Sequence, residues 1–481
     1  MVHGESPLVE AVLRARADPH RPLQIPGHKN RYAVPGGATG VERMEAPWFD
    51  LLHGLVRDDV PLQGGADDNA FSGRYLDQAE ALYAQAIGAD HSRFLVGGSS
   101  QGNIAALMTL AGDGAAFAVD RTSHRSAHAG LVLSGAMPHW VVPEIHPEFG
   151  IPVGVRPDCL AGLPQSCAGV FVTSPSYFGT LSGVRELAGA AHARGVALVV
   201  DQAWGAHLDF TEHGGALRAG ADLSITSIHK ALMGYSQTAT VSSRTSRVDP
   251  ARLDRCVDMT ATTSPSATLL ASIDASRQIM ATDGRGLVSR AAEVTATART
   301  LLRRVRGLVV LDEATLGCAV DPLKLCIFLP GTGAQGADVA ADLWARRHGV
   351  ESADSDRVVM TVSVADDPHD ILATVAKLID IIESHRGQAR QPAPVTVWRL
   401  RPQVVMAPRA AMFAPRQRVE LAGAADRVSA EQFCPYPPGV PILAPGERIT
   451  EEVIEAIGVA SRVGRVAYAS DRSLRTIEVV A

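Results

Sequence analysis

A lysine preceded by a histidine follows an apolar, hydroxyl-rich run in the segment SITSIHKALMGYS, residues 224–236. A lysine in apolar surroundings usually extends its ammonium group to water. The rarer alternative is that burial lowers the pKa of the amine, so that it can lose a proton and attack a carbonyl carbon. Lys230 is therefore either a surface lysine after a strand or a candidate nucleophile, and the segment alone leaves both interpretations open.

Three further polar groups follow strand-like runs of apolar residues. The segment GGSSQGN (97–103) places Ser99 and Ser100 where a helix begins, and N–H groups at a helix N-terminus favour an anion such as a phosphate. His124 follows the run AAFAVD, and Asp201 ends the run VALVVD. Each group also has an ordinary structural alternative: a helix cap for the serines, a turn or core histidine, and an aspartate that caps a helix or pairs with an arginine.

The four groups together fit one cofactor. Pyridoxal 5′-phosphate needs a phosphate site, a partner for the ring face, a carboxylate for the pyridinium nitrogen and a lysine for the aldehyde. Segment 97–103 offers the first, and His124, Asp201 and Lys230 offer the others in chain order. The phosphate segment matches neither GxGxxG nor GK[ST], so nucleotide binding is not supported.

From about residue 75 the sequence alternates helix-like and strand-like segments. The strand-like runs are apolar throughout, which is typical of a parallel sheet covered on both faces, and ligands bind at the carboxyl ends of such strands. We therefore expect an α/β fold whose sheet brings the four groups to one edge. The helix-like segments are 75–89, 100–111 and 184–195, and the strand-like segments are 92–98, 115–120, 169–174, 196–203 and 221–230.

The later sequence indicates further domains. A long helix-like region at 266–306 would leave the sheet domain, after which shorter strand-like and helix-like segments alternate again. The expected organisation is an N-terminal arm (1–60), a large cofactor-binding domain (61–307), a small α+β domain (308–387) and a C-terminal subdomain (388–481).

The composition favours a cytoplasmic enzyme over several other classes of protein. The 51 acidic and 45 basic residues give a net charge of −6 without blocks of like charge, which argues against nucleic acid or an anionic membrane as a partner. No segment approaches the roughly 18 apolar residues that span a bilayer, and the N-terminal segment lacks the apolar run of a signal peptide. The six cysteines form no CxxC pair, so reduced thiols are expected rather than disulfides or metal ligands.

Several segments together carry a resemblance to a known family. They are IPGHKN (25–30), SGRYLDQAEALYAQAIGADHSRFLVGGSSQGN (72–103), DRTSHRS (120–126), VTSPSYFG (172–179), VVDQAWGAH (199–207), TSIHK (226–230), TTSPSATLLASID (262–274) and PYPPGVPILAPGE (435–447). In this order they resemble the compact form of the Orn/Lys/Arg decarboxylase family, which belongs to the fold-type-I (aspartate-aminotransferase-like) pyridoxal-phosphate enzymes. The resemblance implies a lyase of polyamine biosynthesis that removes CO₂ from a basic amino acid.

The resemblance also implies a role for each matching residue. It assigns Lys230 to the internal aldimine, Asp201 to the pyridine nitrogen and His124 to the ring face. The remaining cofactor contacts that it implies are Ser99, Ser100, Ser227 and His229 at or beside the phosphate and Ser176 near the ring hydroxyl. Because the family builds its sites at the interface of a homodimer, the segment TTSP (262–265) is expected to approach the phosphate from the second subunit.

One position bears on which reaction takes place. In aminotransferases of this fold a bidentate arginine holds the substrate carboxylate in the ring plane, in a small-domain strand with a pattern like RISFA. The segment MTVSVAD (360–366) resembles that strand and has Thr361 in the arginine's place, which favours decarboxylation. Transamination, elimination and oxidative deamination on the same fold remain alternatives, and a regulator without catalytic activity is an alternative of another class.

The residues that would bind the distal cation of a basic substrate are less well marked. The candidates are Asp67, Asp68, Glu447, Trp204 and Tyr436, and for each of them a solvated or capping role is the more common alternative. The segment 56–68 also departs from the family's pattern near the mouth of the expected site. The sequence therefore does not separate arginine, lysine, ornithine or a derivative as the substrate.

Overall fold

The computed structural model of the chain describes residues 4–17, 58–60, 74–212, 214–393, 397–435, 439–462 and 466–481. Three candidates for the distal-cation site, Asp67, Asp68 and Tyr436, lie outside these residues, as does the segment 25–30.

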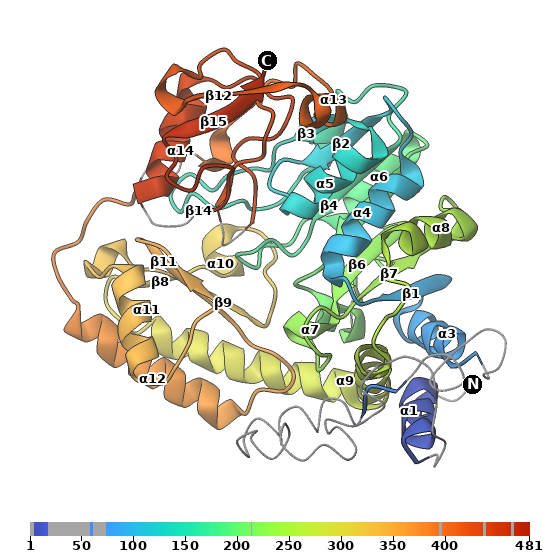
Figure 1. Ribbon diagram of the computed structural model, residues 1–481. Helices are drawn as coiled ribbons and strands as arrows, with labels where there is room; N and C mark the ends of the chain where they lie inside the picture. The colour runs from blue at the N-terminus through green and yellow to red at the C-terminus, as the bar shows by residue number, and fades with distance from the viewer. Residues whose placement is uncertain are drawn as a thin grey trace, which may run out of the picture.

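The apolar runs between residues 91 and 243 form a seven-stranded mixed sheet in the described part of the chain (Figure 1), with the strand order β1-β7-β6-β5-β4-β2-β3. Strands β6, β5, β4, β2 and β3 are parallel, whereas β7 runs antiparallel to both of its neighbours. The strands are β1 (His91–Leu95), β2 (Ala116–Asp120), β3 (Met137–Val141), β4 (Gly169–Thr173), β5 (Ala197–Asp201), β6 (Leu223–Ser227) and β7 (Ala239–Ser243). This confirms the expected α/β fold with a mainly parallel sheet.

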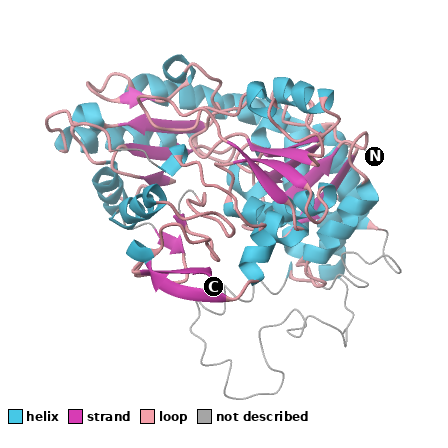
Figure 2. Cartoon of the chain, turned by 90° about the horizontal axis from the view of Figure 1, so that it is seen from above, coloured by secondary structure: helices cyan, strands magenta, loops and turns pink. Residues whose placement is uncertain are grey.

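Alternation along the strands divides the large core between the two faces of the sheet. Val170 and Val172 of β4 pack into one cluster with α1, α3, α6 and α9, while Phe171 packs into the other with α4, α5 and α8. Figure 2 shows helices on both faces of this sheet. The helices are α1 (Pro7–Ala17), α3 (Tyr75–Ile87), α4 (Gly98–Leu110), α5 (Arg125–Ser134), α6 (Val184–Ala193), α7 (Ile228–Ala231), α8 (Pro250–Thr260) and α9 (Ala267–Leu302).

The 36-residue helix α9 connects the large sheet to a four-stranded antiparallel sheet with the order β10-β11-β9-β8 in the described residues. It runs from below the large sheet to α12, which packs against it (Figure 1). The elements of this smaller unit are β8 (Val309–Val310), α10 (Glu313–Leu316), β9 (Lys324–Phe328), α11 (Gly336–Ala345), β10 (Ser352–Ala353), β11 (Arg357–Thr361) and α12 (Pro368–Ser384).

The C-terminal residues form a third unit with its own hydrophobic cluster. It contains α13 (Pro408–Phe413), β12 (Arg416–Glu420), β13 (Cys434–Pro435), α14 (Glu451–Arg462), β14 (Val466–Tyr468) and β15 (Thr476–Val480). Short 3₁₀ helices elsewhere in the chain are η2 (Pro157–Leu160), η3 (Ala206–Phe210), η4 (Pro330–Thr332), η5 (Val397–Arg399) and η6 (Leu421–Gly423). No helix within the described ranges is both long and apolar enough to cross a membrane.

Three details of the expected sheet were wrong. The strand predicted at 221–230 ends at Ser227, and one helical turn, α7, follows it. Strands β3 and β7 were not predicted, and β1 is an edge strand bonded to the antiparallel β7 rather than to a parallel neighbour. The error at 221–230 matters for the site, because the turn from strand to helix sets the direction of the Lys230 side chain.

Candidate active site

A cavity of about 580 Å³ lies where β2, β5 and β6 end, beside the smaller sheet. It brings together five of the eight predicted cofactor-binding residues, Ser99, His124, Asp201, His229 and Lys230, whereas Ser100, Ser176 and Ser227 are not among its lining residues. The other residues that line it are Thr122, Thr173, Tyr177, Ala203, Trp204, Glu351, Thr361, Ser363, Asp366 and Val440. Parallel strands therefore deliver the expected groups to one place, as the carboxyl-end rule predicts.

Lys230 lies in the helical turn α7, immediately after β6. Its Nζ is 4.0 Å from the centroid of the Trp204 ring, and no hydrogen bond to it is found among the described residues. Burial lowers the pKa of Lys230, while the carboxylates of Asp201 and Glu351 oppose this shift. A lysine with a lowered pKa holds a larger fraction of neutral amine, the form that attacks a carbonyl.

Asp201 ends β5 with a carboxylate that is bound only by neutral donors in the described structure. Its Oδ2 accepts from Asn103 Nδ2 at 2.7 Å, and its Oδ1 accepts from the Ala203 N–H at 3.1 Å. Burial raises the pKa of Asp201, opposed by Lys230 and by the Asn103 bond. A cationic partner in the cavity would therefore stabilise this carboxylate.

His124 caps the N-terminus of α5 and shares a hydrogen-bond network with Asp201. Its Nδ1 lies 2.8 Å from Ser126 Oγ, which accepts from Asn103 Nδ2 at 2.9 Å. Burial, together with the positive charges of Lys230 and Arg125, lowers the pKa of His124 to about 4. The imidazole is thus neutral at pH 7 and is held as a fixed planar ring.

The predicted phosphate region combines a helix N-terminus with an unpartnered hydroxyl. Ser99 and Ser100 lie in the first turn of α4, whose first residue, Gly98, has the left-handed conformation (φ 71°). The hydroxyl of Ser227 is fully buried and has no hydrogen-bond partner among the described residues. His229 Nδ1 donates to the Thr238 carbonyl at 2.8 Å, which fixes its ring beside Lys230. An anion here would satisfy donors that the fold otherwise leaves unused.

Two predicted residues are engaged elsewhere. The Ser176 hydroxyl lies 2.6 Å from Thr180 Oγ1 and accepts from the N–H groups of Phe178 and Thr180, so it closes a turn and is not among the residues that line the cavity. Glu447 is 1% exposed and pairs with Arg121 at 3.3 Å, so this residue, a candidate for the distal cation, already has a cationic partner inside the protein. Trp204, another such candidate, lines the cavity.

Sequence reasoning missed four residues at or beside this cavity: Asn103, Lys324, Glu351 and Asp366. Asn103 orients Asp201, Glu351 and Asp366 bring negative charge to the lining, and Lys324 lies directly behind the wall. One signal was available for Lys324: of the 45 lysine and arginine residues only four are lysines, at positions 29, 230, 324 and 377. In a chain that uses arginine for most cations, each lysine is a candidate for a role that needs an amine.

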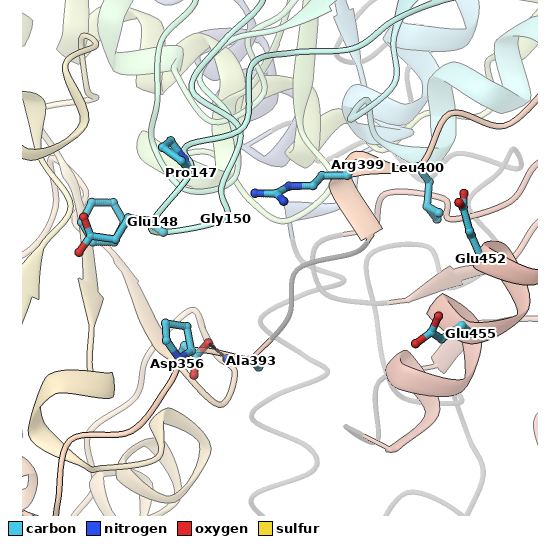
Figure 3. Close-up of a pocket in the computed structure, with 11 residues that line it drawn as sticks. Pro147, Glu148, Gly150, Asp356, Ala393, Arg399, Leu400, Glu452 and Glu455 are labelled. Carbon is cyan, nitrogen blue, oxygen red and sulfur yellow. Dashed lines mark hydrogen bonds between the residues drawn. The ribbon is translucent and has the colours of Figure 1, made fainter.

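A second cavity, of about 560 Å³, lies between the two larger units and the C-terminal unit (Figure 3). Figure 3 shows Glu452 and Glu455 of α14 on one side and Arg399 at its margin. Neither lysine nor histidine is among its lining residues, so it lacks a nucleophile or a base of the kind found in the first cavity. In the described residues no cluster of three or more His, Cys, Asp or Glu is placed to hold a metal ion.

Comparison with solved structures supports the fold assignment. The lysine decarboxylase of Francisella novicida superposes with a TM-score of 0.81 and 18% sequence identity, covering 99% of this chain and 81% of that protein. At this identity the likeness establishes the shared fold, the fold-type-I architecture that was expected.

Sequence comparisons cover nearly the whole chain. It is 32% identical over 477 residues to the arginine decarboxylase of Halalkalibacterium halodurans, covering 96% of this chain and 95% of the relative. It is 31% identical to the arginine decarboxylase of Bacillus subtilis, covering 95% and 94%. Residues 24–317 match the major domain of the Orn/Lys/Arg decarboxylases, and residues 395–464 match their C-terminal domain. The chain therefore belongs to the Orn/Lys/Arg decarboxylase family.

Proposed function

We propose that this protein is a pyridoxal-phosphate-dependent decarboxylase that converts a basic amino acid, arginine in the first instance, into the amine and CO₂. The observation that carries the proposal is the single cavity that holds Lys230, Asp201 and His124 at the carboxyl edge of the parallel strands of one sheet. Arginine is preferred because the relatives that match over nearly the full chain are arginine decarboxylases.

The residues present fit pyridoxal phosphate. The cofactor supplies an aldehyde that bonds amines and a conjugated ring that withdraws electrons from the substrate's Cα. The orphaned Ser227 hydroxyl and the first turn of α4, with Ser99 and Ser100, would bind its phosphate, with His229 alongside. The Asp201 carboxylate, which forms no salt bridge within the described structure, would hold the proton on the pyridine nitrogen.

Other side chains in or beside the cavity would attach, cover and orient the cofactor. Lys230 would hold the cofactor through its amine, whose pKa burial lowers. The neutral ring of His124 would cover one face of the cofactor and exclude water from it. Because Asn103 bonds both Asp201 and Ser126, the acid and the imidazole keep a fixed relative position. Ser176 is left out of this set, since its hydroxyl is used in its own turn.

The acidic part of the lining supports a cationic substrate. Glu351 and Asp366, both from the smaller unit, face the cavity opposite the strand ends of the large sheet. Neither has a salt-bridge partner among the described residues, so their carboxylates are available to a guanidinium or ammonium group. We assign the distal cation of the substrate to this acidic side of the cavity.

A homodimer with shared sites is part of the proposal. Residues 262–264, at the start of the segment expected to reach a second subunit, are exposed. Two large apolar side chains are exposed as well: Met259, three residues before this segment, with 66% of its surface exposed, and Tyr235, whose N–H donates to Ser272 Oγ, with 56% exposed. A second copy covering them would remove apolar surface from water. Sedimentation of the wild-type protein and of Met259→Arg tests this: a dimer that the substitution weakens is expected, and a wild-type monomer contradicts it.

The function is tested by spectroscopy and product analysis together. Purified protein supplied with the cofactor should show the visible absorbance of lysine-bound pyridoxal phosphate, which borohydride removes. Lys230→Ala should lack it, whereas Lys377→Ala, at an exposed lysine of α12, should keep it. Mass spectrometry after incubation with arginine, lysine or ornithine should find the amine. A coloured protein that yields the oxo acid would contradict decarboxylation, and a colourless one would contradict cofactor binding.

A further inference from the structure

A second buried lysine, Lys324, lies beside the cavity. It begins β9 and is 1% exposed. Its Nζ is 3.9 Å from the centroid of Trp204, the same indole that Lys230 contacts at 4.0 Å. In the described structure Nζ makes one hydrogen bond, which it donates to Thr361 Oγ1 at 2.8 Å. The two residues are paired between the neighbouring strands β9 and β11. Because Trp204 and Thr361 both line the cavity, the ammonium group lies directly behind its wall.

The large sheet domain holds the stem of Lys324 in place. A side chain at Gly179, where φ is 94°, would put its Cβ 2.7 Å from both Cβ and Cγ of Lys324, so glycine leaves the space that the lysine fills. The Asp321 N–H donates to the Gly179 carbonyl at 2.7 Å, and His207 pairs with the Asp321 carboxylate at 2.8 Å. Arg299 donates to the Lys324 carbonyl at 2.7 Å. These contacts hold Lys324 of the smaller unit against the large sheet domain. They therefore fix the position of its amine.

The ammonium group of Lys324 lacks an anionic partner. It carries three donors, of which one is used, and no carboxylate of the described chain lies within 4.0 Å of it. The nearby Asp321 is committed to His207 and to the Leu323 N–H. A buried cation without a counter-ion is costly, so an anion from outside the chain is the partner that this geometry calls for.

The surrounding charges leave Lys324 protonated at neutral pH. Burial lowers its pKa and the Lys230 charge lowers it as well, the carboxylates of Asp321 and Glu351 oppose these shifts, and the resulting pKa is about 8. The remaining titratable neighbour is the Cys326 thiol, whose own pKa burial raises to about 12. The charge that an anion would meet is therefore present at pH 7 and is lost as the pH rises through about 8.

We propose that Lys324 and Thr361 form the subsite for the α-carboxylate of the amino acid, an assignment that rests on the proposed function. In an α-amino acid the nitrogen and the carboxylate share one carbon, and the two lysines that would meet them contact one indole. Thr361 accepts from Lys324, so its own O–H is free to donate into the cavity. One ammonium and one hydroxyl hold a carboxylate without the planar, two-bond grip of an arginine. The carboxylate can then turn out of the ring plane, as decarboxylation requires.

The test uses two ligands without an amino group, which cannot react with the cofactor. They are 5-guanidinopentanoate and butylguanidine, which differ only in the carboxylate. Calorimetric titration of the cofactor-loaded wild type should show at least about tenfold tighter binding of the carboxylate compound at pH 7, the usual scale of a charged hydrogen bond. Lys324→Met should abolish that preference and Lys377→Met should keep it. In the wild type the preference should decline from pH 7 to pH 9.

Several outcomes would overturn the subsite while leaving the proposed function intact. One is an unchanged preference in Lys324→Met, and another is loss of its visible cofactor band, which would assign the lysine to the cofactor. The melting temperature separates a structural role, because removing an unpaired buried ammonium should leave it unchanged or raise it. A lower melting temperature together with a lost preference would contradict the proposal. If Lys324→Met does not fold, Thr361→Val must reduce the preference by about threefold, and an unaffected ratio rejects the subsite.

Discussion

Two regions of the molecule bury charged residues near the carboxyl edge of the large sheet. In one region the charge has an ion-pair partner within the protein, and in the other it does not. At the C-terminal unit Arg121 donates to the Pro441 and Ile442 carbonyls at 2.7 and 2.9 Å and pairs with Glu447 at 3.3 Å. At the cavity, Asp201 is bound only by neutral donors within the described residues and has no ion pair there.

The difference separates structural charges from functional ones. A buried ion pair with additional hydrogen bonds is satisfied by the fold, and losing one member leaves the other uncompensated. A buried charge without a counter-ion costs stability and persists where a ligand completes it. The Arg121 pair should therefore control unfolding and leave the chemistry unchanged, whereas Asp201 should do the reverse. Four experiments test this comparison.

The largest effect is expected from Asp201→Asn, which keeps the size of the side chain and removes its charge. The turnover rate should fall more than about a thousandfold, because the carboxylate would no longer hold the ring proton. The free energy of unfolding of the cofactor-free protein should stay the same or rise, since a buried carboxylate is removed. Steady-state kinetics and urea denaturation measure the two quantities. Retention of activity within tenfold would remove Asp201 from the mechanism.

The second effect is on stability. Arg121→Met should lower the free energy of unfolding by about 3–5 kcal/mol, because Glu447 is left buried without its cation. The turnover rate per folded molecule and the visible cofactor band should stay unchanged.

The pH dependence of this loss follows from Glu447. Burial already raises the pKa of Glu447, opposed by Arg121, so removing the arginine raises it further. A raised pKa means that the folded state binds more protons, so the deficit should shrink as the pH falls and grow as it rises. Adding Glu447→Gln should recover most of the stability. Denaturation curves at several pH values check both points, and a deficit independent of pH and of Glu447 would contradict the ion-pair explanation.

The sequence predicted the elements whose residue patterns are local. The strands β2, β4 and β5 are continuous apolar runs, and helices α6 and α9 follow helical spacing, so their predicted ranges agree with the structure to within a few residues. Strand β7, ATVSS, is buried but composed of small and hydroxyl residues, and β3, MPHWV, contains a proline. Neither has a strong strand signal of its own, because pairing with neighbours, not local preference, places them in the sheet.

The site was predictable to the extent that it lies at strand ends. Asp201, His124 and Lys230 follow strands of the large sheet, and topology alone brings them together. Lys324 begins a strand of a different sheet and lies behind the cavity wall, where the Asp321–His207 pair joins the two units. No local pattern reports such docking, so residues of this kind require the three-dimensional structure.

A smaller effect is expected from Asn103→Ala. Asn103 donates to Asp201 and to Ser126, and its bond to Asp201 lowers the pKa of that carboxylate. Without this donor the pKa of Asp201 should rise, and the acid limb of the pH profile of kcat/KM should move to higher pH. At pH 7 the rate should fall about tenfold, the scale of one hydrogen bond to a charged group. A tenfold loss without any shift of the acid limb would mean that Asn103 does not act through Asp201.

The smallest effect is expected from Ser227→Ala, and a matched serine sharpens it. The Ser227 hydroxyl is buried without a partner in the described chain, so its removal should change the free energy of unfolding by less than about 0.5 kcal/mol. If it binds the cofactor's phosphate, the dissociation constant for the cofactor should rise about fivefold, as measured by following the absorbance while the cofactor is added.

Ser176→Ala should do the opposite. The Ser176 hydroxyl bonds Thr180 and two N–H groups, so the variant should lose about 1–3 kcal/mol of stability and keep its cofactor affinity. The two serines thus differ in the same way as Asp201 and Arg121. The group without a partner should affect ligand binding, and the group with partners should affect stability. Equal effects of the two substitutions on cofactor affinity would show that an unpartnered buried group does not mark a ligand contact in this protein.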